Sequence, residues 1–380
     1  MGRMLNFKQG QQIRLCAIFV ALTLAAVAFV FHSSLPGRVR AVMGIVAFIV
    51  AMVACSTNPA RIRWRTVAWG FGLQLLLGVV ILKLAVGGMR PGYAVFSALA
   101  AVITRFLEFT SVGAVFVFGE IADPQSMGAV FPNGFVLAFA ALPIIIFVSA
   151  VFTVLFHLGI VQVVVRLMAQ LMMPLMGTSG AETLSAAANV FMGQTEAPII
   201  VRPYILRMTQ SELLALMTGG LSTIAGSVFA VYVGLGADPV AMLTTSVMAA
   251  PCGLYLAKIL LPETEVPVTA DQVVGDVGRK HANVIDAAAS GAANGMQLAL
   301  NVAAMLIAFL AFIAMFDYGL GLIRPGLSMS GMMAFVFSPV AALIGVPSSD
   351  IPAVADLLGT KLALNEMVSY VKLNGEYAGL

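Results

Sequence analysis

The sequence predicts an all-α protein that crosses a membrane several times. Hydrophobic residues make up 61% of the 380 residues and charged residues only 10%, a balance that excludes an ordinary soluble domain. Apolar runs long enough for a spanning helix, about 20 residues, recur along the chain. Two further apolar stretches are broken at glycine or proline beside polar side chains. The net charge of +3 is too small to suggest a nucleic-acid partner.

In the first half of the chain, spanning helices are predicted at 15–33, 41–58 and 66–86. The basic N-terminus precedes the first run without a clear signal-peptide cleavage site, so we expect a retained helix. The stretch 92–120 carries more charge, which favours an interfacial helix over a span. Between Pro124 and Val165 no Asp, Glu, Lys or Arg occurs. There we expect a loop and a long tilted helix, kinked at Pro143.

In the second half, spanning helices are predicted at 213–235, 239–261 and 294–316. Segments 174–204 and 335–372 fit a span less well. Each is apolar at first, then breaks at Gly or Pro, and then carries a carboxylate. The polar stretch 263–286 lies between them and separates two halves of the apolar core.

These two broken segments form a faint internal repeat, Leu175–Pro198 and Leu343–Val368. Each copy opens with Leu-x-Gly, has an acidic residue five positions after that glycine, and reaches a second carboxylate about 20 residues after it. Transporters are often built from repeats whose short, Gly- or Pro-interrupted segments meet near the membrane midplane. The pattern therefore favours a transporter.

The polar run GQTEAP, Gly193–Pro198, is the strongest candidate for a binding site. Glycine allows close backbone approach and Pro198 disfavours helix just before it. A break there would leave Gln194, Thr195 and Glu196 together with free backbone groups, a set that suits a neutral ligand bearing NH, C=O and OH groups. The alternative is a solvated loop end between two helices.

Two further groups of residues are candidates for ligand binding. Glu366 is a good acceptor for sugar hydroxyls, unless it lies in the headgroup region or pairs with Lys361. The glycine-rich helix 219–232 favours local unwinding, which would bare carbonyls at Thr223 and Ile224. Hard oxygen ligands of this kind, together with the side chain of Asn189, suit a small alkali cation. The alternative is that the small residues only permit close helix packing.

An intramembrane enzyme is the alternative from a different class. Gly177–Gly180 reads GTSG and matches the G-x-S-G of rhomboid proteases, but such an enzyme needs a histidine on a later spanning helix to activate the serine. After Ser179 the only histidine is His281, which lies in the polar connector. His157 and the three cysteines are better explained as packed residues than as ligands. We therefore expect no enzyme.

The motifs themselves resemble those of one family. The segment AAANVFMGQTEAPIIVRPY is similar to the signature of the concentrative nucleoside transporters, and GGLSTIAGSV, VMAAPCGLYLAKILLPETE, ANVIDAAASGAANGMQLALNVAAMLIAF and GTKLALNEMVSY match other family segments in order. The resemblance covers about residues 41 to 380. Family members continue with a second broken helix and a final helix that complete the ribose site, and this sequence ends before them.

The resemblance implies a scaffold domain around a moving transport domain, with two re-entrant helical hairpins and broken helices arranged as inverted repeats. An extra N-terminal helix would occupy 1–40, and scaffold helices with the interfacial helix 41–173. The first repeat of the transport core would be 174–262. A polar connector and a scaffold helix would follow at 263–334, and the second hairpin at 335–380.

The resemblance also implies the ligands. The nucleobase would be bound by Gly193, Gln194, Thr195, Glu196 and Val228, and the ribose by Glu366. Sodium would be held by the side chains of Asn189 and Thr223 and the carbonyls of Met192 and Ile224.

The function implied is import of nucleosides such as uridine or adenosine by alternating access, coupled to sodium, in a homotrimer embedded in cell-membrane lipids. Proton coupling is the alternative, because some relatives use protons. A channel is disfavoured, because a buried Gln-Thr-Glu cluster suits saturable binding rather than rapid passage.

Overall fold

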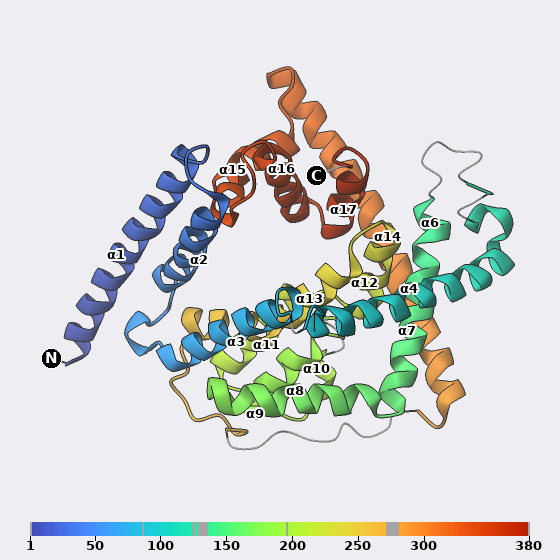
Figure 1. The fold of residues 1–380 in the computed structure, drawn as a ribbon, viewed down its shortest axis with the longest axis horizontal. Coiled ribbons are helices and arrows are strands. Elements are labelled where there is room, and N and C mark those ends of the chain that lie inside the picture. The colour runs from blue at the N-terminus through green and yellow to red at the C-terminus, as the bar shows by residue number, and fades with distance from the viewer. Residues whose placement is uncertain are drawn as a thin grey trace. The chain divides into compact units, whose positions relative to one another are not determined.

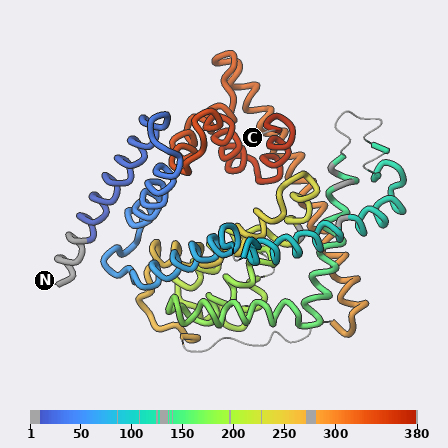
Figure 2. The backbone as a smooth tube through the Cα atoms, in the orientation of Figure 1, coloured from blue at the N-terminus to red at the C-terminus, as the bar shows by residue number. Residues whose placement is uncertain are grey.

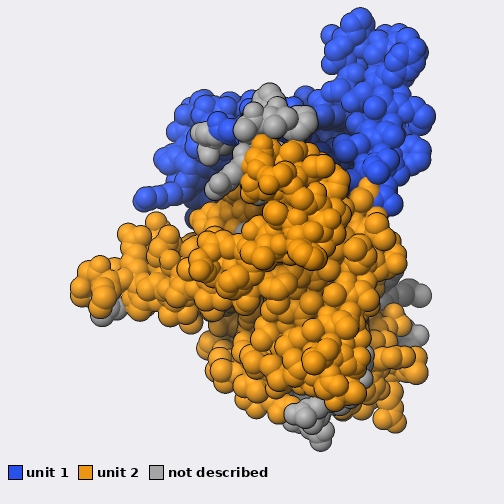
Figure 3. Space-filling view, turned by 90° about the vertical axis from the view of Figure 1, so that its right-hand side faces the viewer, with its two compact units in different colours: residues 1–60, 304–380 blue, residues 61–303 orange. Residues whose placement is uncertain are grey.

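A computed structural model describes residues 2–85, 87–123, 126–127, 136–194, 197–270 and 281–378. The regular elements in those ranges are helices, which confirms the predicted all-α class. The chain divides into two compact units, residues 1–60 with 304–380 and residues 61–303, coloured separately in Figure 3. Each unit is described by itself below.

The first unit is built around the N-terminal helix pair and the C-terminal helices (Figures 1 and 2). Its helices are α1 (Gly2–Val30), α2 (Gly37–Ala54), the later part of α14 (Val284–Ile323), α15 (Met329–Ile344), α16 (Ile351–Ala363) and α17 (Glu366–Asn374). Helix α2 packs on both α1 and α15, and α15 packs on α16. Gly44 lets α2 approach α15 closely, because a Cβ there would lie 2.1 Å from the carbonyl oxygen of Leu343.

The second unit contains the remaining helices. They are α3 (Trp64–Leu82), α4 (Pro91–Phe118), α6 (Leu137–Ala140), α7 (Leu142–His157), α8 (Ile160–Met176), α9 (Gly180–Ala188), α10 (Ala197–Ile200), α11 (Gln210–Ser222), α12 (Gly226–Gly234), α13 (Pro239–Leu260) and the start of α14. Short 3₁₀ turns lie at Pro59–Arg61, Gly119–Ala122 and Ile205–Arg207. Helix α9 is buried along its whole length and packs on α8, α11 and α13.

Most of the predicted spans coincide with long apolar helices. Among the described residues six helices are long and apolar enough to cross a membrane, namely Gly10–Val30, Gly37–Ala54, Trp64–Leu82, Pro91–Ala122, Pro239–Leu260 and Val284–Ile323. The fourth contains the stretch 92–120, so its length and composition also permit a span. Its predicted interfacial position stays a prediction.

Two of the predicted helices take a different form. The stretch 213–235 is not one continuous span, because α11 ends at Ser222 and α12 begins at Gly226. Pro143 does not kink a helix but lies in the first turn of α7, where its missing N–H costs nothing. The bend comes instead at Gly159, whose φ of 82° ends α7, and α8 departs at 73°.

Candidate functional site

The segment that leads to the GQTEAP run is the short helix α9 and the turn after it. Ser179 and Glu182 form a capping box at its start, which satisfies backbone donors that a nine-residue helix would otherwise leave free. The helix ends at Asn189, and the chain turns through Phe191 and Met192 before α10 begins at Ala197. This short helix and its turn present Asn189–Gln194 at the C-terminal end of α9.

The predicted unwinding of the glycine-rich helix is confirmed. Helix α11 is capped at Thr209 by a second capping box with Glu212 and ends at Ser222. Thr223 and Ala225 have extended backbone, with ψ of 159° and 137°, and the chain becomes helical again at Gly226. The carbonyls of Thr223 and Ile224 thus lie in an interruption between two helices, where the helical i→i+4 bonding is broken.

Glycines let the end of α9 and its turn pack directly against this interruption. A Cβ at Gly193 would lie 2.8 Å from the Cβ of Ala225, and one at Gly220 would lie 2.8 Å from the Cβ of Gln194. At Gly226 a Cβ would approach the carbonyl oxygen of Phe191 to 2.5 Å. Real Cβ atoms do not come this close, so larger residues would separate the two segments.

Asn189 lies at the centre of this contact. Its side chain is fully buried, and among the described residues neither its amide nitrogen nor its amide oxygen has a hydrogen-bond partner. A buried polar group without a partner costs about 1–3 kcal/mol, so such groups call for an explanation. The negative ends of the α9 and α11 dipoles both point to this place, which favours a cation.

The other predicted sodium ligands lie in the same two segments. Met192 is buried in the turn after α9, and Ile224 is half-buried in the interruption. The Thr223 hydroxyl donates to the carbonyl oxygen of Gly219 at 2.9 Å, which leaves its oxygen lone pairs available. The structure therefore brings together the two segments that carry the four predicted ligands.

The predicted nucleobase ligands are only partly described. Gly193 is buried and Gln194 is exposed beside it, while Val228 is half-buried in the first turn of α12. Thr195 and Glu196 lie outside the described residues. Of the candidate base contacts, the structure therefore places Gly193, Gln194 and Val228.

The predicted ribose ligand belongs to the other compact unit. Glu366 is the first residue of α17, after the N-cap Asn365, whose side chain accepts a hydrogen bond from the backbone of Val368. Its carboxylate pairs with Lys361 at 2.7 Å, which confirms the pairing considered from the sequence. The half-buried side chain keeps part of its surface accessible for a further acceptor role.

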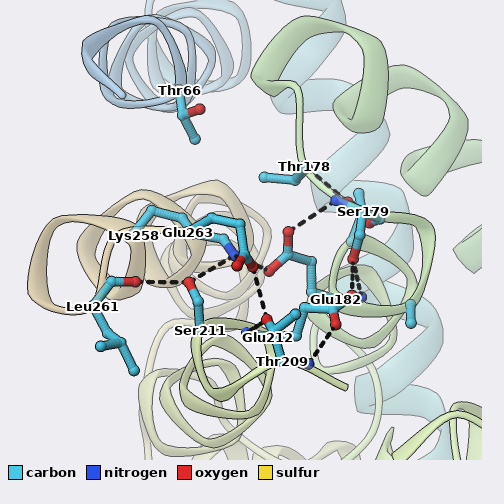
Figure 4. Close-up of polar contacts among 12 residues, drawn as sticks. Thr66, Thr178, Ser179, Glu182, Thr209, Ser211, Glu212, Lys258, Leu261 and Glu263 are labelled. Atoms are coloured by element: carbon cyan, nitrogen blue, oxygen red, sulfur yellow. Dashed lines mark hydrogen bonds and ion pairs between the residues drawn. The ribbon is translucent and has the colours of Figure 1, made fainter. Parts of the chain in front are cut away.

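Sequence reasoning missed a buried polar network at the other end of α9 and α11 (Figure 4). We call it the capping network, and its members are Ser179, Glu182, Thr209, Ser211, Glu212, Lys258 and Glu263. The pattern Ser/Thr-x-x-Glu occurs at both helix starts and could have revealed the two capping boxes. It could not have revealed the partners, which come from α13 and the segment after it.

In this network Ser179 has a structural role. Its hydroxyl accepts from the backbone of Glu182 and donates to Glu212. This use of Ser179 as a helix cap accounts for the GTSG motif without an activated nucleophile. Glu263, just beyond α13, is buried, which alone would raise its pKa. Hydrogen bonding from Thr209 and the charge of Lys258 outweigh burial and hold the pKa of Glu263 below its ordinary value.

Three family models match successive parts of the chain. Residues 43–121 match a model described as Na+ dependent nucleoside transporter N-terminus, residues 138–239 one described as nucleoside recognition (Gate), and residues 241–378 one described as Na+ dependent nucleoside transporter C-terminus. The three matches follow one another in chain order.

Individual proteins are similar over most of this chain. Sodium/nucleoside cotransporter 1 of Homo sapiens is 40% identical over 90% of this chain and 51% of its own length, so the chain spans about half of that relative. An uncharacterized transporter of Haemophilus influenzae is 41% identical over 87% of this chain and 78% of its own. The structure of CNTnw in an inward-facing substrate-bound state is 39% identical with a TM-score of 0.83, covering 89% of this chain and 80% of that one.

Proposed function

The chain belongs to the concentrative nucleoside transporter family, and we propose on that premise that it imports nucleosides together with sodium ions. It is a multi-pass membrane protein, so the import would take place across the cell membrane. The observation that carries the proposal is the buried amide of Asn189, which has no hydrogen-bond partner among the described residues, at the point where α9 and α11 both end. A sodium ion would supply the missing partner for the amide oxygen.

The proposed sodium ligands are the side-chain oxygens of Asn189 and Thr223 and the carbonyls of Met192 and Ile224. All four are neutral hard oxygens, which suit an alkali cation, and two helix C-termini add partial negative charge. Neutral ligands gain little from a proton, since none of them becomes more stable by accepting one near neutral pH. This chemistry favours sodium over the alternative coupling ion, a proton.

The nucleoside would bind beside the ion. Gly193, Gln194, Thr195 and Glu196 would contact the base, with Val228 on α12. Glu366 would accept hydrogen bonds from the ribose hydroxyls, with Lys361 holding its carboxylate in place. Because Gln194 directly follows the turn that carries Met192, an ion there would order the base ligands as well.

Coupling follows from this shared segment. If the ion orders the turn that binds the base, each ligand raises the affinity of the other by the same factor. Alternating access would then move the loaded site across the membrane. In line with the family resemblance of the sequence, we propose that the protein works as a homotrimer surrounded by membrane lipids.

Uptake into proteoliposomes tests the proposal. Radiolabelled uridine and adenosine should accumulate against their gradients, saturably, when a sodium gradient is imposed. Accumulation driven by a pH gradient and indifferent to replacing sodium by choline would establish proton coupling instead. Non-saturable equilibration without accumulation would indicate a channel.

Thr223→Val sharpens the test of the ion site. It removes one proposed ligand oxygen at nearly constant volume, so the sodium concentration for half-maximal uptake should rise. Uridine affinity at saturating sodium should change less. A variant with unchanged sodium dependence would remove Thr223 from the ligand set.

A further inference from the structure

The capping network lies at the N-terminal ends of the two helices whose C-terminal ends carry the proposed sodium ligands. Glu182 precedes Asn189 by seven residues, and Glu212 precedes Gly219 by seven. Seven residues are close to two helical turns, about 10 Å, so the residues of each pair lie on the same helix face. Gly219 in turn abuts Asn189, because a Cβ at Gly219 would lie 2.9 Å from the amide nitrogen of Asn189.

Within the network each capping box is bonded to the other helix. The carboxylate of Glu212 accepts from its own cap, the backbone of Thr209 at 2.8 Å, and from the hydroxyl of Ser179, the cap of α9. Since Ser179 also caps its own helix, one hydroxyl joins the starts of α9 and α11. An axial slip of one helix past the other would break this bond between Ser179 and Glu212.

Lys258 of α13 ties the two helix starts to a third element. Its ammonium group lies 2.7 Å from Glu182 and 3.2 Å from Glu263, and it donates to the hydroxyl of Ser211 at 2.9 Å. Glu263 also accepts from the hydroxyl of Thr209 at 2.8 Å. The lysine therefore holds α9 through Glu182, and α11 through both Ser211 and the Glu263 bond to Thr209.

The charged side chains of the network are almost completely buried. The side chains of Lys258, Glu182 and Glu263 are 7%, 1% and 5% exposed. In such a low-dielectric environment, leaving an ionised group without its partner costs free energy. A network whose groups are all bonded therefore permits few alternative geometries. A buried polar network of this kind specifies relative position more than it adds net stability.

We propose that Glu182, Lys258 and Glu263 are positioning residues for sodium binding, which set the axial register of α9 against α11. That register decides how far Asn189 at the end of α9 lies from Thr223 at the end of α11. Ligand geometry in a metal site must be held to within about 0.5 Å, whereas one residue of slip along a helix is about 1.5 Å. The inference rests on the proposed sodium site.

Sodium binding by purified variants tests the inference. Lys258→Gln should raise the sodium concentration for half-maximal uridine uptake by about threefold or more. Uridine affinity at saturating sodium should stay close to that of the parent, because enough sodium restores the site. The same comparison can be made without transport: the rise in Tm that sodium causes in detergent, relative to choline, is measured for the parent and for Lys258→Gln.

A second variant and a matched control keep the test decisive. If Lys258→Gln does not fold, Glu263→Gln preserves the side-chain shape and an acceptor for Thr209 while removing one charge of the pair. Thr66→Val is the control, because Thr66 makes a buried bond of 2.8 Å to the carbonyl oxygen of Met176 close to the network without joining it. The control should leave sodium dependence unchanged.

The outcomes separate this inference from the proposed function. A parent protein whose uptake ignores sodium contradicts the proposed function. A sodium-dependent parent together with folded network variants that bind sodium as the parent does contradicts the positioning role alone. A shift in the control as large as in Lys258→Gln would also contradict it, since any buried polar loss would then suffice.

Discussion

The two copies of the internal repeat share a local plan but hold their carboxylates in different ways. In the first copy α8 ends at Gly177 with φ of 65°, and the short helix α9 follows. In the second, α15 ends at Gly345 with φ of 89°, and α16 follows. Glycine is suited to both positions because a side chain in this left-handed region is strained.

The acidic residue five positions after each of those glycines illustrates the difference. Glu182 completes a capping box, is buried, and pairs with Lys258 from outside its copy. Asp350 is half-buried and accepts a hydrogen bond from the neighbouring Ser349. The lysine pair of the second copy is centred instead on Asp356, and its partner Lys372 lies on α17, just beyond that copy. The same spacing therefore gives the same turn, while burial and partners decide what the carboxylate does.

The largest expected effect comes from removing Lys258, the partner of Glu182 in the first copy. Lys258→Met would leave Glu182 and Glu263 buried without a counter-charge, and breaking such a pair costs about 3–5 kcal/mol. The free energy of unfolding in mixed detergent micelles measures this loss. The double variant Lys258→Met with Glu182→Gln should recover part of it. A double variant no more stable than the single one would contradict the electrostatic explanation.

Removing Lys372, the partner of Asp356 in the second copy, should cost less. Lys372 lies 2.6 Å from Asp356, but its side chain is 21% exposed, and Asp356 would keep its bonds from Ser330 and Tyr377. Losing one charged hydrogen bond from a group that stays bonded predicts a loss of about 1.5–3 kcal/mol for Lys372→Met. The same unfolding measurement applies. A loss larger than that of Lys258→Met would reverse the comparison between the copies.

Acid should weaken the capping network through Glu263. Its pKa in the folded protein lies below the ordinary value of 4.5, so its bonds contribute stability that is fully present above pH 4.5. That contribution is lost as the pH falls below 4.5 through the lower folded-state pKa. Unfolding measured as a function of pH should therefore show a shallower acid decline for Glu263→Gln than for the parent. Identical profiles would exclude Glu263 as a contributor.

The smallest expected effect is at the ion pair of Lys361 with Glu366. Their side chains are 55% and 28% exposed, and exposed pairs contribute only about 0–1 kcal/mol. Lys361→Met should therefore leave the unfolding free energy nearly unchanged, as measured beside Lys372→Met. Destabilisation equal to that of Lys372→Met would mean that exposure does not govern the strength of these pairs.

Much of the fold followed from local features of the chain. Apolar length placed the spans near α1, α2, α3, α13 and α14, and the glycines around Thr223 marked a real interruption between helices. The prediction of a kink within a helix at Pro143 was wrong, because Pro143 lies in the first turn of α7, where a proline loses no bond; the 73° bend between α7 and α8 lies at Gly159.

The sequence by itself determined the membrane class, most of the long helices, the interruption near Thr223 and the family. Hydrophobic length, glycine and proline act within a few residues, so those features can be read along the chain. Only the tertiary structure decided that Asn189 is buried with no hydrogen-bond partner in the described part of the chain, and that Lys258 lies between Glu182 and Glu263. Such pairings join residues far apart in the chain, and burial by neighbouring helices, which no local pattern encodes, sets the energy of each charge.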